Sequence, residues 1–578
     1  MADKVIVTNV TALKTKYKNA GFKAIQTTVK ALIAADKKRG LATTLIAVDD
    51  EQAMKKLGAT HVKNASSFRE NKAAIDGVYR ALAPDYVMIL GAIDVIPHQD
   101  MKNPLFTTDP DGDIEEFAYG DLPYASDAPY SRNIKDFTGP TRVVGRLPDL
   151  TGQSDPKYLV DLLQTAAGWK SSPKSDYQAY LGISAEKWQE STAESLTNIF
   201  SSSDDLQTSP DRGYRWKSKL INRRVHFINC HGGDTYPDFI GQSSTDDEIM
   251  PVSHAAAFVG KKGKLVEGTI AAAECCFGGQ LYDPSAVDGR QMGMCNTYLA
   301  KKAYGFFGST TTAYGPFSGN DQADLICQYF IQRVLAGASI GRAALEARQR
   351  FVERSSPLSP MNRKTLAQFN LYGDPSIVPV AAESSTLVVG PTIKSLSSAM
   401  KSIGKTKSIV AAKAVQEAGA VERGERRRTL SAKGALLSQL QPVLSRSDQA
   451  TPSKVESSLK KIMGQLNLRP LNTISFNVET AESPALMVKT PMAKGITKAV
   501  AAKKQNTTAF HVMFGLAATA VPSTPMKKSN KAGTVIKGIP AKGKKALGQQ
   551  ESPIRKFAVL EAKEVDGKIV SVKEAHSK

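Results

Sequence analysis

Short apolar runs alternate with amphipathic stretches through the first 380 residues of the chain. The runs at 5–8, 44–48 and 86–91 are rich in Val, Ile and Leu and have the length of strands. Residues 13–36 place apolar side chains at helical spacing, and a second helical stretch ends at Leu82. Strands that alternate with helices predict a parallel sheet with helices on its faces.

The same alternation resumes after residue 154. Its predicted elements are a helix at 155–169, strands at 180–183, 225–230, 268–274 and 303–310, and helices at 185–200, 322–335 and 340–354. We therefore expect an α/β fold with two subdomains, residues 1–154 and 155–380, each built on parallel strands flanked by helices.

The pattern changes beyond residue 380. Residues 381–470 are predicted to form a basic helical linker region, and residues 471–578 a small basic β-rich domain. The strands expected in this domain lie at 473–478, 486–488, 510–514, 557–562 and 568–572, the last two joined at Asp566-Gly567, a pair typical of hairpin turns.

Charge separates the same two parts. Residues 381–578 hold 33 Lys and Arg against 13 Asp and Glu, whereas residues 1–380 hold 43 against 42. The chain is therefore a nearly neutral body joined to a basic C-terminal region. Such a region either solubilises the protein or contacts a polyanion such as nucleic acid, because scattered lysines neutralise phosphates without reading a sequence.

The cysteines and the hydropathy of the chain indicate in which compartment the protein works. The five cysteines are Cys230, Cys275, Cys276, Cys295 and Cys327. An odd number, with two adjacent, argues against a disulfide framework and for a reducing compartment. No apolar run approaches the roughly 18 residues of a membrane span, and the first residues lack the pattern of a secretion signal. We expect a cytoplasmic protein.

Two of the predicted strands end in reactive side chains. The run from Val225 stops at His231-Gly232-Gly233, and the run from Gly268 stops at Cys275-Cys276 before a further pair of glycines. Neighbouring parallel strands bring their carboxyl ends together, where open α/β sheets bind ligands. An imidazole there would favour a thiolate and later protonate a leaving amine.

Gly232 has a place in the same chemistry, since its N–H can approach a developing oxyanion without a Cβ in the way. Each reactive side chain has a purely structural alternative, as a satisfied core histidine or an ordinary buried thiol. A zinc site is disfavoured, because adjacent side chains on strands cannot all converge and no Cys-x-x-Cys spacing is present.

An acidic loop has two interpretations, an acidic surface turn and a calcium site. Asp109, Asp111 and Asp113 alternate around Gly112, a spacing that suits calcium. The loop lacks the full length of a helix–loop–helix calcium site, and an acidic surface turn is the alternative. No cofactor is required by the chemistry predicted at the strand ends.

Motifs spread over residues 5–378 share their order with a known family. They are the strand Tyr86–Gly91 with Ile96-Pro97 behind it, Ser126-Asp127-x-x-Tyr130, the strand Val144-Gly145-Arg146, the two reactive strand ends, and Gly373-Asp374-Pro375-Ser376. In this set the chain resembles the gingipain-type cysteine peptidases of the caspase-like superfamily, clan CD. The resemblance implies a caspase-like fold and peptide-bond hydrolysis.

The resemblance also implies roles for single residues. His231 falls on the family's catalytic histidine and Gly232 on its oxyanion glycine. The family's Cys-x-x-Gly pattern is satisfied from Cys275, which we take as the nucleophile. Neighbouring strand side chains point to opposite faces, so only one of the two adjacent cysteines can face His231. Glu274 departs from the small residue that the family more often has.

Substrate preference is predicted from Asp127. In arginine-cleaving members an aspartate in this context lies at the bottom of the pocket for the residue before the scissile bond, where a buried carboxylate would select Arg or Lys. The alternative is that Asp127 caps a turn. Other residues are also candidates: Glu116, Asp234 and Asp246 for the acidic group, Ser309 and Tyr314 for the pocket wall, and Asp94 for an acid that orients the histidine.

The sequence thus predicts a cysteine endopeptidase that cleaves protein or peptide substrates after a basic residue. Arg426, Arg427 and Arg428 form a candidate self-processing site, because such an enzyme accepts them as substrate. The alternative function is a non-catalytic scaffold, or a polyanion- or nucleic-acid-binding protein, that keeps a peptidase fold.

Overall fold

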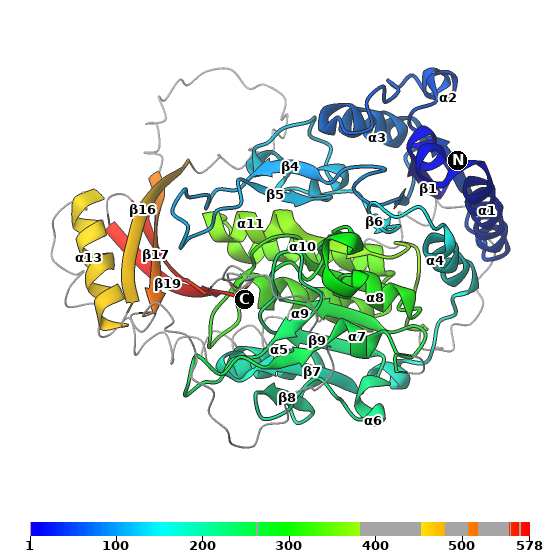
Figure 1. The fold of residues 1–578 in the computed structure, drawn as a ribbon. Helices are drawn as coiled ribbons and strands as arrows, with labels where there is room; N and C mark the ends of the chain where they lie inside the picture. The colour runs from blue at the N-terminus through cyan, green and yellow to red at the C-terminus, as the bar shows by residue number, and fades with distance from the viewer. Residues whose placement is uncertain are drawn as a thin grey trace, which may run out of the picture.

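The computed structural model describes residues 2–261, 264–381, 452–466, 468–479, 507–517, 554, 556–565 and 568–578. These residues form a large α/β body and a small sheet beside it (Figure 1). The candidate self-processing site at Arg426, Arg427 and Arg428 and the strand expected at 486–488 lie outside the described residues.

A ten-stranded sheet organises the large body, in the order β2-β1-β3-β6-β15-β13-β12-β9-β7-β8. Its strands are β1 (Lys4–Thr8), β2 (Thr43–Ala47), β3 (Tyr86–Leu90), β6 (Val144–Leu147), β7 (Tyr180–Ala185), β8 (Leu206–Ser209), β9 (Val225–Asn229), β12 (Ile270–Ala273), β13 (Gly305–Ser309) and β15 (Phe369–Tyr372). β15 runs antiparallel to β13 and meets β6 at one residue pair. The strands of both predicted subdomains therefore belong to one sheet, and the mostly parallel α/β class is confirmed.

Helices flank this sheet and two short hairpins extend from it. The helices are α1 (Val10–Lys38), α2 (Glu51–Lys56), α3 (Phe68–Leu82), α4 (Lys157–Gly168), α5 (Gln189–Phe200), α6 (Ser218–Ile221), α7 (Ala256–Val259), α8 (Met294–Ala300), α9 (Gln322–Leu335), α10 (Ile340–Ser355) and α11 (Pro360–Gln368). The hairpins pair β4 (Gln99–Lys102) with β5 (Phe117–Gly120), and β10 (Phe239–Ile240) with β11 (Val252–His254).

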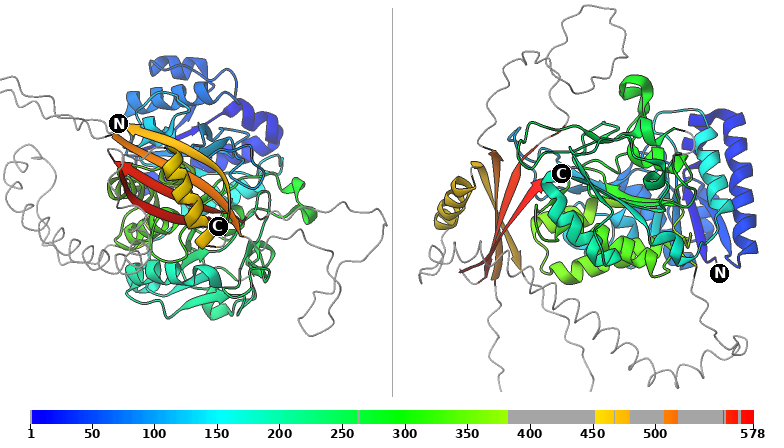
Figure 2. Two further views of the ribbon diagram at one scale, coloured as in Figure 1. Left: turned by 90° about the vertical axis from the view of Figure 1, so that its left-hand side faces the viewer. Right: turned by 90° about the horizontal axis from the view of Figure 1, so that it is seen from below.

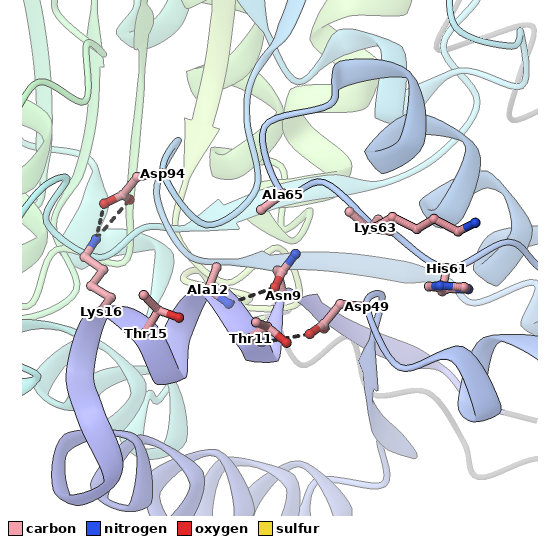
Figure 3. Close-up of a pocket in the computed structure, with 11 residues that line it drawn as sticks. Asn9, Thr11, Ala12, Thr15, Lys16, Asp49, His61, Lys63, Ala65 and Asp94 are labelled. Atoms are coloured by element: carbon pink, nitrogen blue, oxygen red, sulfur yellow. Dashed lines mark hydrogen bonds and ion pairs between the residues drawn. The ribbon is translucent and has the colours of Figure 1, made fainter.

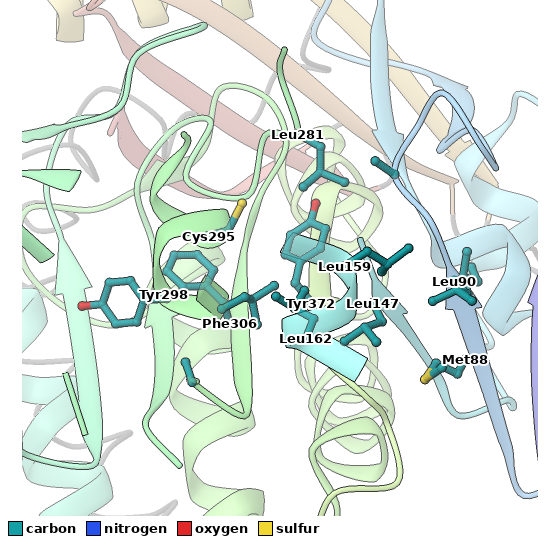
Figure 4. Packing of buried hydrophobic residues seen from close by; sticks show 14 of the residues in the cluster. Met88, Leu90, Leu147, Leu159, Leu162, Leu281, Cys295, Tyr298, Phe306 and Tyr372 are labelled. Atoms are coloured by element: carbon teal, nitrogen blue, oxygen red, sulfur yellow. The ribbon is translucent and has the colours of Figure 1, made fainter. Parts of the chain in front are cut away.

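Alternation along the strands separates two apolar cores. Phe306 points toward α8, where its ring lies 5.3 Å from Tyr298, and Phe307 points toward α9, where its ring stacks at 4.7 Å on Phe330. Figure 4 shows the core on the α8 side, with Tyr298, Phe306 and Cys295 together. Because both faces of the central strands are buried, their sequences are apolar runs and do not alternate between apolar and polar residues.

The small sheet has five strands in the order β14-β19-β18-β17-β16. They are β14 (Tyr314–Gly315), β16 (Leu468–Glu479), β17 (Thr507–Ala517), β18 (Ala558–Val565) and β19 (Lys568–Ser577), and α13 (Pro452–Gln465) accompanies them. All five pair antiparallel. β14 belongs to the large body, so the C-terminal strands extend an edge that the body supplies.

Both faces of this sheet are covered. Val455, Leu459 and Met463 of α13 pack on the outer face against Met513 and Leu560. The inner face packs Phe514, Phe557 and Val559 onto the body residues Leu105, Tyr314 and Met361. Figure 2 shows the sheet between α13 and the body. Among the described residues, no helix has both the length and the apolarity to cross a bilayer.

Candidate active site

His231 and Cys276 come from the ends of adjacent parallel strands. The register between β9 and β12 pairs Ile228 with Ala273, and its continuation places His231 opposite Cys276. Gly232 lies directly against the cysteine, because a Cβ on residue 232 would be 1.8 Å from the Cys276 carbonyl oxygen. The predicted meeting of the two strand ends is therefore present.

Strand alternation decides which cysteine shares the histidine's face. Ala273 and Cys275 lie in the core on the α8 side together with Cys230, whereas Ala272 and Cys276 lie in the core on the α9 side. Cys275 Sγ is 3.8 Å from the Ile228 carbonyl oxygen, and burial raises the pKa of this thiol well above its usual value. The structure brings Cys276 to the face of His231, and not Cys275, which the family pattern had favoured.

The His231 ring is held on two sides. Its Nε2 lies 2.8 Å from Gln242 Oε1, and the Gln242 amide nitrogen is 3.2 Å from Asp247 Oδ1. Trp188 packs against the ring at a centroid distance of 4.6 Å. Because the glutamine oxygen can only accept, Nε2 carries the proton and Nδ1 keeps its lone pair. This Nδ1 is buried and has no hydrogen-bond partner among the described residues.

The Cys276 thiol faces Ala313. The Ala313 N–H donates to Sγ at 3.2 Å, and Sγ lies 3.5 Å from the Ala313 carbonyl oxygen. Burial raises the pKa of Cys276 to about 12 and lowers that of His231 to about 3. Both groups are therefore neutral at physiological pH in this closed arrangement.

Lys578, which directly follows β19, lies beside Cys276. The Cys276 N–H donates to the Lys578 backbone oxygen at 3.2 Å, and the Lys578 N–H donates to the Ala313 carbonyl at 3.0 Å. The preceding residues pair with β14, Ser577 opposite Tyr314 and His576 opposite Gly315. The chain's own C-terminal residues thus run in extended form past Cys276.

The Lys578 side chain fills an acidic pocket. Its amine lies 2.6 Å from Glu274 Oε2 and 2.8 Å from Asp324 Oδ2, and all three side chains are fully buried. Trp188 is 5.8 Å from the amine, within cation–π range. Gly315 leaves room for the stem, since a Cβ there would lie 2.1 Å from Lys578 Cε.

The pocket carboxyls favour a cation strongly. Burial, and then the neighbouring Asp324, raise the pKa of Glu274 well above its usual value, whereas Lys578 opposes this rise. Burial alone would lower the pKa of Lys578, but the two carboxylates outweigh it and the pKa is raised. Without a cation, one carboxyl would have to hold a proton, because two buried carboxylates cannot both ionise side by side.

The predicted specificity residue Asp127 lies elsewhere. Its side chain is 68% exposed and binds Arg142 at 2.8 Å, with Thr141 as a second partner. Of the alternatives, Asp234 binds Gln280 at 2.6 Å. Asp246 and Glu116 are not among the partners of the Lys578 amine. The acidic group beside the cysteine is the pair Glu274 and Asp324.

Asp94 is also away from the histidine. It binds Lys16 at 2.7 Å and accepts from the Gly152 N–H at 3.0 Å. It lines an open pocket of about 580 Å³ at the start of α1, where the Lys16 contact is seen (Figure 3). The residue that orients His231 is Gln242.

The two predicted wall residues have different places. Tyr314 lies in β14 and pairs through its backbone with Ser577, while its hydroxyl binds Asp113 on the other side. Ser309 donates its hydroxyl to the Thr311 carbonyl at 2.7 Å. The backbone of β14 pairs with the C-terminal residues, and the Tyr314 side chain packs in the same apolar cluster as Ala575.

The acidic loop does not gather its carboxylates. Asp113 is buried against Lys364 at 2.5 Å, and Asp111 binds Arg469 at 3.3 Å. Asp109 accepts from the Asp111 N–H at 3.1 Å. In the described part of the chain, no group of three or more His, Cys, Asp or Glu side chains is placed to hold a metal ion.

Glu274, Asp324 and Gln242 were missed as site residues by reasoning from the sequence. A signal existed for Glu274, because residues two apart on a strand share a face and Glu274 precedes Cys276 by two. Asp324 and Gln242 come from α9 and from β10's loop, and no local pattern links them to the strand ends.

Comparison with known proteins identifies a family for most of the chain. The model of peptidase family C25 matches residues 3–380. No curated protein matches the sequence. Solved structures are also similar to this chain, among them the following two. One, titled "Structure of Protease", is 14% identical with a TM-score of 0.40, over 65% of this chain and 78% of the other. The second is the Saccharomyces cerevisiae separase–securin complex, 13% identical with a TM-score of 0.25, over 41% of this chain and 14% of the other.

Proposed function

The chain belongs to peptidase family C25 and is a cysteine peptidase, and from this premise we propose that it hydrolyses peptide bonds after a basic residue, lysine above all, with Cys276 as nucleophile and His231 as base. The proposal keeps the predicted histidine and the predicted basic preference. It moves the nucleophile from Cys275 to Cys276 and the specificity from Asp127 to Glu274 and Asp324.

One observation carries the proposal. The Lys578 backbone oxygen lies 3.2 Å from the Cys276 N–H while the amine of the same residue lies between two buried carboxylates. A substrate lysine in this position would have its carbonyl beside the nucleophile and its charge neutralised in the pocket. Binding and chemistry are thus aligned on one residue of the substrate.

The proposed reaction uses Nδ1 of His231, the ring nitrogen that does not face Gln242. The Cys276 thiol gives its proton to Nδ1, and the thiolate attacks the carbonyl carbon after the substrate lysine. The N–H of Cys276, which contacts the Lys578 oxygen here, stabilises the resulting oxyanion, and Gly232 keeps the oxyanion role expected from the sequence. Nδ1–H then protonates the leaving amine, and a water molecule activated by the same nitrogen hydrolyses the thioester.

Gln242 has a positioning role in this cycle. Its oxygen accepts from Nε2–H whether or not Nδ1 is protonated, so the ring keeps one orientation through both proton transfers. Asp247 holds the glutamine amide and so fixes which atom of Gln242 faces the ring. The pair replaces the acid that Asp94 was predicted to provide.

Mapped covalent labelling tests the proposal. Because Lys578 fills the pocket, the test is made on the Lys578→Glu background. There a lysyl chloromethylketone should alkylate Cys276 in the otherwise unchanged chain and in Cys275→Ala, but not in Cys276→Ala. Turnover of a lysyl reporter peptide on the same background should be retained in Cys275→Ala and lost in Cys276→Ala and His231→Ala. Capture at Cys275, or turnover that survives in Cys276→Ala, would overturn the assignment.

Three finer points belong to the proposal. Self-processing at Arg426, Arg427 and Arg428 follows from a basic preference, and fragment mapping of wild type against Cys276→Ala tests it. A reducing, cytoplasmic location is supported by five cysteines that are all free and buried. Contact of residues 381–578 with a polyanion is supported by their charge alone.

A further inference from the structure

We propose that β19 is a built-in inhibitor of the same chain, with residues 574–578 bound as a substrate would be and Lys578 in the place of the residue before the scissile bond. The inference rests on the proposed function, because it assigns a regulator to that same site. β19 must leave this site before a substrate can bind there.

The backbone contacts are those of a bound peptide. β19 adds to β14 as an antiparallel strand, with Ser577 opposite Tyr314 and His576 opposite Gly315. Addition of a strand to an exposed edge is a general way to bind an extended peptide, with the main chain giving affinity and alternate side chains giving selectivity. Here β14 supplies the edge and the Lys578 pocket supplies the selectivity.

The catalytic groups are closed off in this state. Cys276 is 3% exposed and His231 is 1% exposed. His576 of β19 stacks on Phe317 at 3.6 Å, and Phe317 in turn packs against Trp188, which covers the His231 ring. No second peptide can occupy β14 and the acidic pocket while β19 remains.

A second contact ties the inhibitor to the residues that position the histidine. Lys556, just before β18, donates to the Asp247 carbonyl oxygen at 2.8 Å, and Asp247 holds Gln242. Lys556 and His576 also contribute to the low pKa of His231, after burial. The C-terminal segment therefore acts on the base as well as on the nucleophile.

The rest of the small sheet keeps the inhibitor in place. β18 and β19 pair along their length, and Lys573 binds Asp321 of the body at 2.6 Å. The inner face of the sheet buries Phe514, Phe557 and Val559 against the body. A tethered strand of this kind competes at a high effective concentration, commonly in the millimolar range, so an external peptide displaces it poorly.

Displacement of β19 should therefore raise activity. We compare full-length wild type, Lys578→Glu and a chain lacking residues 574–578, measuring turnover of a lysyl reporter peptide. Both variants should be faster by about tenfold or more, because a tether at millimolar effective concentration is removed or weakened. Lys578→Glu keeps the sheet intact and ejects only the side chain, since a third carboxylate would face Glu274 and Asp324.

A peptide added in trans gives the reciprocal test. The synthetic peptide of residues 574–578 should inhibit the shortened chain, and the same peptide with Glu at its last position should not. Equal rates in all three proteins together with no inhibition by the peptide would overturn the inhibitor while leaving the peptidase intact.

The opposite failure is distinguishable. If both variants fold, by circular dichroism and melting, and iodoacetamide reacts faster with Cys276 than in wild type, but no lysyl substrate is cleaved, then β19 covers the site and the proposed lysyl peptidase activity is wrong. If the shortened chain does not fold, Lys578→Glu and the added peptide decide the question alone.

Discussion

The amine of Lys578 lies 2.6 Å from the carboxylate of Glu274, with both side chains fully buried. Glu274 precedes the proposed nucleophile by two residues. Asp324 of α9 binds the same amine, as the second carboxylate of the pocket. A buried charge pair of this kind is retained only where both members are present, because either one alone is costly in the interior.

Glu274→Gln should lower kcat/KM for lysyl substrates by about a hundredfold, since the loss of one partner of a buried charge pair costs about 2–5 kcal/mol. Steady-state kinetics on the Lys578→Glu background, where β19 no longer competes, measures the effect. Glu267→Gln is the matched control, because Glu267 pairs with Lys302 at the surface. Equal losses in both variants would contradict the pocket.

Gly315→Ala should block the pocket while leaving the dyad intact. Its Cβ would lie 2.1 Å from Lys578 Cε and 2.4 Å from Asp324 Oδ2, so a lysine side chain cannot pass. On the Lys578→Glu background, we expect loss of lysyl turnover with retained alkylation of Cys276 by iodoacetamide. Gly139→Ala is the control, because no atom lies within 4 Å of its added Cβ. Unchanged lysyl kinetics in Gly315→Ala would show that the substrate lysine does not bind between Glu274 and Asp324.

Gln242→Leu should lower kcat with little change in KM, by about tenfold to a hundredfold, because general base catalysis depends on the ring orientation. Gln242→Glu should instead restore much of the rate and raise the pKa of His231, shifting the acidic limb of the pH–rate profile upward. The exposed Gln178→Leu is the control. A pure KM effect would indicate that Gln242 contacts substrate instead.

The pH dependence of alkylation should report the closed state. Burial raises the pKa of Cys276 to about 12, so thiolate is scarce at neutral pH and becomes more abundant as pH rises. In wild type, iodoacetamide labelling of Cys276 should increase about tenfold for each pH unit through pH 10. In the chain lacking residues 574–578 the rate should level off near or below the usual thiol pKa of about 8.5. Identical profiles, mapped by mass spectrometry, would show that β19 does not bury the thiol.

Asp127→Asn should leave lysyl and arginyl kinetics within about threefold of wild type. Its carboxylate is 68% exposed and bound to Arg142, a buried guanidinium that also binds Asp76, so the change should affect local stability more than turnover. Side-by-side kinetics with Glu274→Gln separates the two acids. A large and selective loss in Asp127→Asn would return the specificity to the residue that the family motif indicated.

The sequence predicted where the two reactive strands end. It did not predict which of the adjacent cysteines lies on the same face of the sheet as His231. His231-Gly232 and the adjacent cysteines stand out in the sequence because apolar runs stop there at reactive residues and glycine. The choice between Cys275 and Cys276 needed the register of β9 against β12, which decides the shared face and which hydropathy does not encode. Had that register been known, alternation would have paired Cys276 with His231 and with Glu274.

Specificity lay further out of reach of sequence reasoning. Asp324 and Lys578 are 254 residues apart along the chain, and their contact depends on how the small sheet docks on the body. The basic C-terminal region was interpreted as solubilising or polyanion-binding, because charge composition does not show that a segment packs against the body. The strands predicted at 557–562 and 568–572 correspond to β18 and β19, but their packing against the body was not predicted.

β14 belongs to the catalytic body, yet its hydrogen bonds and the apolar residues Leu105, Tyr314 and Met361 are covered by the C-terminal strands. A protein truncated to residues 1–381 would expose an unpaired strand edge beside an apolar surface, and this combination favours self-association. Recombinant production of a well-behaved monomer therefore calls for co-expression of the C-terminal sheet, even for studies aimed only at the catalytic body.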